Sequence, residues 1–136
     1  MPGSKSDYLE LKVLDGVLGG PDFTRPGTVY VGLFTVTPAD AGGGTEVATG
    51  AYARAAVTNN STNFPAASGT TAVKANGTAI TFPRATASWG TVVAFGVFDA
   101  ASAGNLLYWG PLGTSRLVSI DDTPSFAIGA LTFTED

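Results

Sequence analysis

The sequence contains no cysteine and no histidine among its 136 residues. Without cysteine there is no disulfide, no thiolate nucleophile and no thiolate ligand for a metal. Without histidine the chain lacks the side chain most used for acid–base catalysis near neutral pH, which excludes histidine-dependent serine triads and histidine-ligated zinc or iron. An enzyme of this composition would depend on carboxylates, lysine, tyrosine or serine. We therefore expect no enzymatic activity, no cofactor and no metal.

Charged residues are also scarce. They make up 13% of the chain, about half of the ~25% usual in soluble domains. The formal net charge of -4 repels phosphate, so we expect no nucleic-acid partner. The longest apolar stretch, residues 91–97, is far shorter than the ~20 residues that span a bilayer. The polar first residues have no signal-peptide-like apolar run behind them, so we expect no membrane partner either.

The composition favours one folded domain. Hydrophobic residues reach 44%, with 18 Gly and 8 Pro, which excludes the low hydrophobicity and high charge of disordered chains. The length falls within the ~100–150 residues typical of a domain. We expect residues 1–136 to form a single domain, with an N-terminal helical segment over residues 1–20 and a β core over residues 27–136.

One segment, residues 7–18, has the spacing of an amphipathic helix. Asp7 with Glu10 three residues later predicts a capping box, and the Gly19-Gly20-Pro21 sequence predicts the end of the helix. The apolar side chains at helical spacing are Tyr8, Leu11, Leu14 and Leu18. This stripe either covers the chain's own sheet or docks on a partner. We favour the first, because a single domain must cover its own sheet edges.

The chain after Pro26 has the pattern of short strands separated by turns. Residues 28–36 and 91–99 are apolar on both faces, which predicts central strands covered on both sides. The Asn76-Gly77 pair predicts a type I′ hairpin joining strands at residues 71–74 and 78–82. Further strands are expected at residues 52–57, 105–110, 116–120 and 125–134. About eight strands indicate a mainly β, mostly antiparallel two-sheet sandwich of jelly-roll or Greek-key type.

Three polar or glycine-rich motifs favour turns over ligand sites. Gly42-Gly43-Gly44 lacks the spacing of a phosphate-binding loop and predicts a flexible connection. Asp121-Asp122 has no calcium-loop pattern around it, and an Asx turn before Pro124 explains it better. Asp99, at the end of an apolar strand, is more typical of a turn former than of a catalytic acid.

Aromatic and arginine side chains are the remaining candidates. Trp89, Tyr108 and Trp109 would serve a sugar-stacking platform only if they shared a face, and packing in the core is the more common role of such residues. Two alternatives apply to Arg54, Arg84 and Arg116: each pairs with a carboxylate across a subunit boundary, or each extends into solvent. The candidate interface residues are therefore Tyr8, Leu11, Leu14, Leu18, Arg54, Arg84 and Arg116.

A β domain with so little surface charge is typical of an assembly subunit, because small uncharged residues suit surfaces that neighbours cover. The sequence also resembles a group of small structural proteins of tailed-bacteriophage virions. The resemblance covers most of the chain apart from residues 59–75. The stretches that carry it are SDYLELKVLD at residues 6–15, TVYVGLFT at 28–35, PADAGGGTE at 38–46, FPRATASWGTV at 82–92, FGVFDA at 95–100 and NLLYWG at 105–110.

The resemblance implies a virion component, assembled in the host cytoplasm, with no catalytic or ligand-binding residues to transfer. Our first expectation is a capsid decoration (cement) protein that binds the major capsid protein and stabilises the head shell as a homo-oligomer. For the oligomer we expect a trimer, with a dimer next. A tail, baseplate or tail-fibre component is the alternative. A carbohydrate-binding module is a second alternative, which would require an exposed Trp89 or Trp109.

Overall fold

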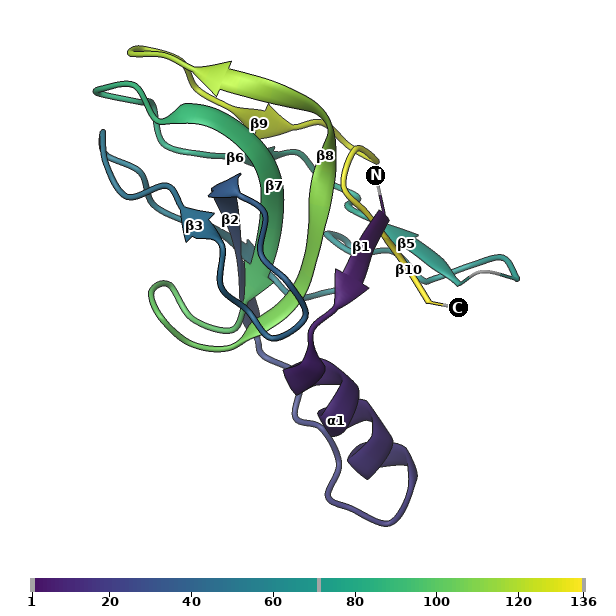
Figure 1. The fold of residues 1–136 in the computed structure, drawn as a ribbon. Coiled ribbons are helices and arrows are strands. Elements are labelled where there is room, and N and C mark those ends of the chain that lie inside the picture. Colours follow the sequence, from purple (N-terminus) through teal and green to yellow (C-terminus); the bar gives the residue numbers. More distant parts are fainter. Residues whose placement is uncertain (1, 71, 136) are drawn as a thin grey trace.

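The computed structural model describes residues 2–70 and 72–135. One helix and ten short strands follow one another along this part of the chain (Figure 1). In chain order they are β1 (Pro2–Lys5), α1 (Asp7–Val17), β2 (Thr28–Val36), β3 (Thr45–Glu46), β4 (Ala55–Thr58), β5 (Val73–Ala75), β6 (Ile80–Thr81), β7 (Gly90–Phe98), β8 (Leu106–Val118), β9 (Ser125–Phe126) and β10 (Thr132–Thr134).

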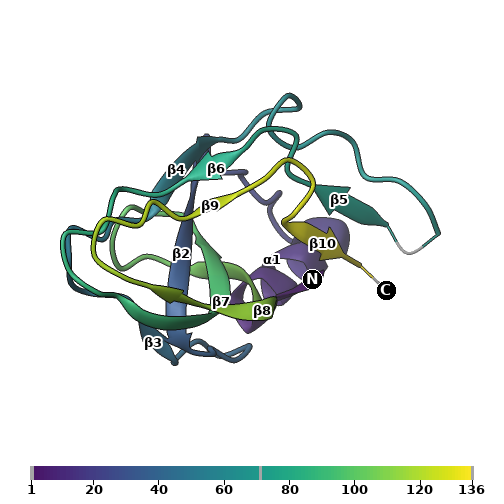
Figure 2. The same cartoon turned by 90° about the horizontal axis from the view of Figure 1, so that it is seen from above.

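The strands form two sheets. The larger has the order β3-β2-β7-β8-β1-β10-β5, with β4 also paired to β2, and the smaller contains β6 and β9. Figure 2 shows β6 and β9 across the interior from β7 and β8. The ladders are antiparallel except for β1 and β10, which run parallel. The predicted mainly β, antiparallel fold with one N-terminal helix is therefore confirmed, with more strands than the eight expected.

The two central strands are those that the sequence predicts. β2 pairs with β7 from Tyr30↔Phe98 to Phe34↔Ala94, because both strands carry apolar side chains on both faces. One face contributes to the main core, where Phe95 is 0% exposed and its ring packs against Phe126 and Phe133. The opposite face carries a smaller cluster built on Phe34, Ala94 and Phe98.

Several strand boundaries differ from the prediction. The segment expected as two strands at residues 105–110 and 116–120 is one long strand, β8, in which residues 112–115 bulge opposite Val93. The segment expected as one strand at residues 125–134 divides into β9 and β10, because Gly129 turns the chain with φ +77. β4 begins at Ala55 rather than at residue 52.

The predicted Asn76-Gly77 hairpin is wrong. β5 pairs with β10 and β6 pairs with β9, so the two strands beside Asn76 do not pair with each other. Asn76 is instead 2% exposed, and its side chain donates to the carbonyls of Thr78 (2.8 Å) and Ala127 (3.0 Å) and accepts from the Leu131 N–H (2.9 Å). Asn76 therefore joins the chain ahead of β6 to the turn between β9 and β10.

Replacing Asn76 with alanine is expected to lower the free energy of unfolding by about 2 kcal/mol, because two part-buried hydrogen bonds to carbonyls and one buried hydrogen bond from an N–H are lost. Urea unfolding of Asn76→Ala and wild type measures this difference. Asn105→Ala is the matched control, since Asn105 is exposed and its side chain donates only to Asp99. If Asn76→Ala lost no more unfolding free energy than Asn105→Ala, the Asn76 side chain could not stabilise the connection between these two segments.

The polar turns follow the sequence predictions. The Asp122 carboxylate accepts a hydrogen bond from the Ser119 N–H (2.8 Å), and the Asp99 carboxylate accepts one from the Asn105 N–H (2.7 Å). Gly42, Gly43 and Gly44 lie in the loop between β2 and β3, all with positive φ. These three motifs lie in turns or loops, as predicted, although the Asp122 side chain bonds back to Ser119 and does not form the predicted Asx turn before Pro124.

Candidate functional site

The start of α1 is fixed to the sheet by Ser6. The Ser6 hydroxyl accepts a hydrogen bond from the Leu9 N–H (3.2 Å) and donates one to the Leu106 carbonyl, while the Ser6 N–H donates to the Leu107 carbonyl (2.8 Å). The N-cap is therefore Ser6 rather than the predicted Asp7. The helix ends as predicted, with Gly19 at φ +83 just after the C-cap Leu18.

The apolar stripe of α1 is exposed. We define the α1 stripe as Leu11, Leu14, Val17 and Leu18, whose exposed fractions are 63%, 59%, 73% and 74%. Of the nine large apolar side chains exposed in the described part of the chain, five belong to α1 or its C-cap. Figure 1 shows α1 projecting from the strands. The expectation that the stripe covers the chain's own sheet is therefore wrong.

The position of Leu9 explains this exposure. Leu9 is 5% exposed and is the buried residue of α1. Since each residue advances about 100° around a helix, Leu11, Leu14 and Leu18 lie about 140–200° from Leu9. The side chain that anchors the helix thus points away from Leu11, Leu14 and Leu18, whereas Val17 lies about 80° from Leu9. Of the predicted helical residues, Tyr8 alone packs partly against the core.

An apolar groove lies beside the base of α1. Its volume is about 460 Å³. Buried Val29, Val97 and Leu107 contribute to its lining, and half-buried aromatic rings from four parts of the chain join them: Phe23, Phe64, Tyr108 and Phe133. No sequence motif predicts this groove, because its lining comes from segments far apart along the chain.

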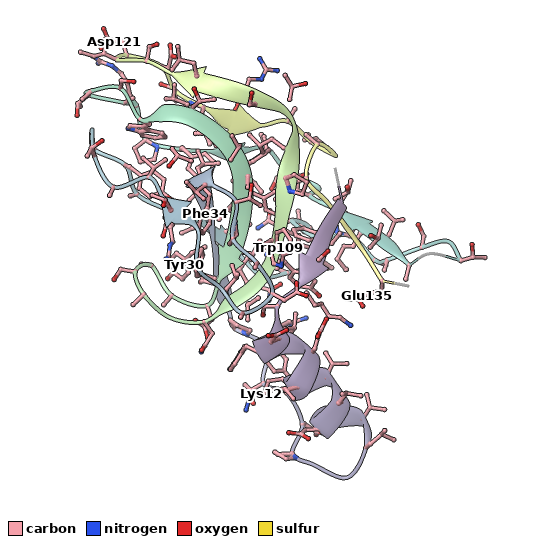
Figure 3. The ribbon with its side chains drawn as sticks, in the orientation of Figure 1. Lys12, Tyr30, Phe34, Trp109, Asp121 and Glu135 are labelled. Atoms are coloured by element: carbon pink, nitrogen blue, oxygen red, sulfur yellow. The ribbon has the colours of Figure 1, made fainter. Side chains whose placement is uncertain are left out.

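The edge of this groove carries charged side chains. Arg25 is exposed, Lys74 donates to the carbonyls of Phe64 (3.3 Å) and Pro65 (2.9 Å), and Glu135 pairs with Lys5 at 2.6 Å. Figure 3 shows Glu135 beside β1. Burial, followed by the negative charge of Glu135, raises the pKa of Tyr108. The groove is therefore apolar inside, with cationic groups at its edge.

Arg54 is paired within its own chain. Its side chain is 7% exposed and binds both carboxylate oxygens of Glu46 at 2.8 Å. It also donates to the carbonyls of Ala100 (2.8 Å) and Ala103 (2.9 Å). The guanidinium lies 3.5 Å from the centre of the Phe98 ring. Arg54 is therefore seen neither to pair across a subunit boundary nor to extend into solvent, since Glu46 of its own chain pairs with its charge.

Tyr52 completes this cluster. Its hydroxyl donates to Glu46 and accepts a hydrogen bond from the Leu33 N–H (3.0 Å). Burial, and then the hydrogen bond to the Glu46 carboxylate, raises the pKa of Tyr52 well above its ordinary value of 10.0. Tyr52 thus stays a neutral hydrogen-bonding group within the folded protein.

This pKa shift predicts a loss of stability in alkali. Above about pH 10 the unfolded chain releases the phenol proton while the folded chain keeps it, so the free energy of unfolding falls as pH rises. Near neutral pH the free energy of unfolding of wild type should exceed that of Tyr52→Phe by about 1–3 kcal/mol, since the variant loses two hydrogen bonds. Urea unfolding of both proteins at about pH 8 and about pH 11 should show this difference narrowing. An equal difference in the free energy of unfolding at both pH values would contradict the raised pKa of Tyr52.

The other two candidate arginines are exposed. Arg84 pairs with Asp121, and their side chains are 67% and 65% exposed. Arg116 is exposed in β8 and forms no ion pair with any residue that the structure describes. Their place in an interface stays a prediction.

The three candidate aromatic residues do not form one platform. Trp89 is 4% exposed, and its indole N–H donates to the Gly50 carbonyl (2.9 Å). Tyr108 packs against Phe133, with ring centres 5.1 Å apart. Trp109, labelled in Figure 3, is half-buried and donates to the Asp40 carboxylate (2.8 Å). Trp89 therefore packs in the core, which is the role that the sequence favours for these aromatic residues.

Across residues 2–70 and 72–135, no three acidic side chains gather closely enough to hold a metal ion. No helix in these ranges combines the length and apolar character needed to cross a bilayer.

Comparison with known protein families matches the chain to a family described as podophage GP4 fiber I protein gp80. The family matches residues 4–134 and so includes α1 and every residue that lines the groove except Glu135. No curated protein matches the sequence. The chain belongs to the family of the podophage GP4 fiber I protein gp80 and is a structural protein of the phage virion.

Proposed function

We propose that this chain is a structural subunit of a phage fibre. The observation that carries the proposal is the family match, which covers residues 4–134 and names a fibre protein. The exposed α1 stripe supports it, because exposed apolar patches of this kind mark surfaces that partners cover. The subunit acts by binding its neighbours in a homo-oligomer and by withstanding load, with no catalysis, cofactor or metal.

The fibre role replaces our first expectation, a capsid decoration protein bound to the major capsid protein. The family description favours the tail-fibre alternative, and no feature of the structure favours the head shell over the fibre. A carbohydrate-binding role loses part of its support, since Trp89 lies in the core. We infer that the partners are copies of this chain and other fibre proteins, with neither nucleic acid nor membrane involved.

Copy number and location in purified virions test the proposal. Quantitative mass spectrometry against the major capsid protein should give a small number of copies per particle. Gold-labelled antibodies should bind to the fibres and leave the head unlabelled. A ratio near one copy per major capsid subunit, with labelled heads, would overturn the fibre role in favour of decoration.

A further inference from the structure

Two complementary surfaces of this chain are unfilled. The α1 stripe is an exposed row of apolar side chains on a helix, and the groove is an apolar hollow of about 460 Å³ beside the base of that helix. We propose that the α1 stripe of one copy docks in the groove of the next copy, joining subunits head to tail. The proposal rests on the structural role proposed above and names the partner as a second copy of this chain.

A chain cannot fill its own groove with its own stripe. Leu9, which lines the groove, anchors α1 from the side that faces the sheet. Leu14 and Leu18 lie on the opposite side of the helix, and the hydrogen bonds of Ser6 hold the start of α1 on β8. Turning the stripe inward would expose Leu9 and break these bonds. The occupant must therefore come from another molecule.

The charges of the two surfaces are complementary. The helix carries three acidic residues, Asp7, Glu10 and Asp15, and one basic residue, Lys12. The edge of the groove carries Arg25 and Lys74, while Glu135 is neutralised by Lys5. Arg25 is exposed and forms no ion pair within the described ranges. An acidic helix with an apolar stripe suits a groove of this kind.

A bundle of α1 helices from several copies is the competing use of the stripe. Leu11, Leu14 and Leu18 have the 3–4 spacing of a coiled-coil seam. Glu10 and Asp15 flank that seam, however, and in a parallel bundle they would bring like charges together. The groove offers positive charge instead, so we favour it as the docking partner.

A head-to-tail contact has a consequence for the assembly. Two copies that exchange their helices reciprocally fill both stripes and both grooves in a closed dimer. Where the exchange is not reciprocal, each bound copy still presents a free stripe and a free groove, and the contacts either close into a larger ring, such as a trimer, or continue as an open fibre.

The oligomeric state of the recombinant full chain tests the proposal by sedimentation velocity. The helix variants are Leu14→Asp and Leu18→Asp, and the groove variant is Arg25→Glu combined with Ala67→Glu. All four positions are exposed, so the fold should be kept, which thermal unfolding checks. The matched controls are Leu117→Asp in β8 and Ala101→Glu in the turn after β7, which make the same kinds of change at exposed positions outside both surfaces.

We expect wild type and both controls to associate with micromolar dissociation constants. The helix variants and the groove variant should each raise the constant at least tenfold. An equimolar mixture of Leu14→Asp with the groove variant should then form dimers only, since one intact stripe meets one intact groove.

A monomeric wild type at high micromolar concentration would overturn the proposal. If the groove variant still associated and only the helix variants lost association, the proposal would be overturned in favour of a helix bundle. Failure of the mixture to form dimers would equally contradict a head-to-tail contact. None of these outcomes depends on where the chain lies in the virion, so the fibre role is tested separately.

Discussion

Replacing Arg54 with alanine is expected to lower the free energy of unfolding by about 3 kcal/mol, near the lower end of the range for breaking a buried ion pair. The side chain is 7% exposed and makes four hydrogen bonds, two to Glu46 and two to carbonyls of the turn after β7. Its loss leaves the Glu46 carboxylate, itself 24% exposed, without its cation. Urea unfolding near neutral pH measures the change.

Arg84→Ala is the matched control for this experiment. Arg84 also pairs with a carboxylate, but both side chains are about two-thirds exposed, so its removal should cost less than about 1 kcal/mol. The loss of unfolding free energy for Arg54→Lys should lie between those of the two alanine variants, because lysine keeps the positive charge but cannot bind both carboxylate oxygens of Glu46 at once. Equal losses for Arg54→Ala and Arg84→Ala would show that burial adds nothing to the Arg54 pair.

The second large effect is expected at Phe95. Its ring is 0% exposed, and its centre lies 6.3 Å from that of Phe126 and 5.9 Å from that of Phe133. Phe95→Ala removes the packing that joins β7 to β9 and β10, and such cavities cost about 3–5 kcal/mol. Thermal and urea unfolding should both register the loss, which is a large part of the about 5–15 kcal/mol that a domain possesses.

Graded and exposed substitutions separate packing from other effects at this site. Phe95→Leu keeps most of the volume and should cost less than about 1.5 kcal/mol. Leu117→Ala, at a position 64% exposed, should stay within about 0.5 kcal/mol of wild type. If Phe95→Ala were no worse than Leu117→Ala, the core could not be centred on Phe95.

The sequence predicts the parts of this fold that depend on local pattern. β2 and β7 have the predicted positions because each is a continuous apolar run that needs cover on both faces. The helix is predicted within one residue of its bounds by apolar spacing and by Gly19. The turns at Asp99 and Asp122 follow from side chains that bond to backbone only a few residues away.

Features that depend on distant partners are not predictable in this way. Asn76 looks like a hairpin residue because its neighbours in sequence suit a turn, but its three hydrogen bonds include two to residues 127 and 131. Gly77 is needed for space rather than for φ, since a Cβ there would lie 2.4 Å from the Thr62 carbonyl oxygen. β1 was missed because four polar and small residues carry no strand pattern.

The candidate site also combines a feature that the local sequence predicts with features that depend on distant segments. The spacing of Leu11, Leu14 and Leu18 predicts a stripe, but spacing does not say which side of the helix is anchored. That side is set by Leu9 and by the bonds of Ser6 to β8. The groove is invisible in the sequence because Phe23, Phe64 and Phe133 meet only after folding.

The pairing of β1 also determines when the fold can be completed. β1 pairs with β8 through Ser4↔Trp109 and with β10 through Pro2↔Thr132, so the strands that meet there are separated by most of the chain. Closing such long loops costs entropy before any contact forms, and chains dominated by distant pairings fold slowly, in milliseconds to seconds. During synthesis β1 therefore remains unpaired until β8 has been made, and its β10 side until residue 132 has left the ribosome. The sheet should accordingly be completed only after β10 has been made, and a nascent chain stalled before β10 would be prone to aggregation through its open sheet edge.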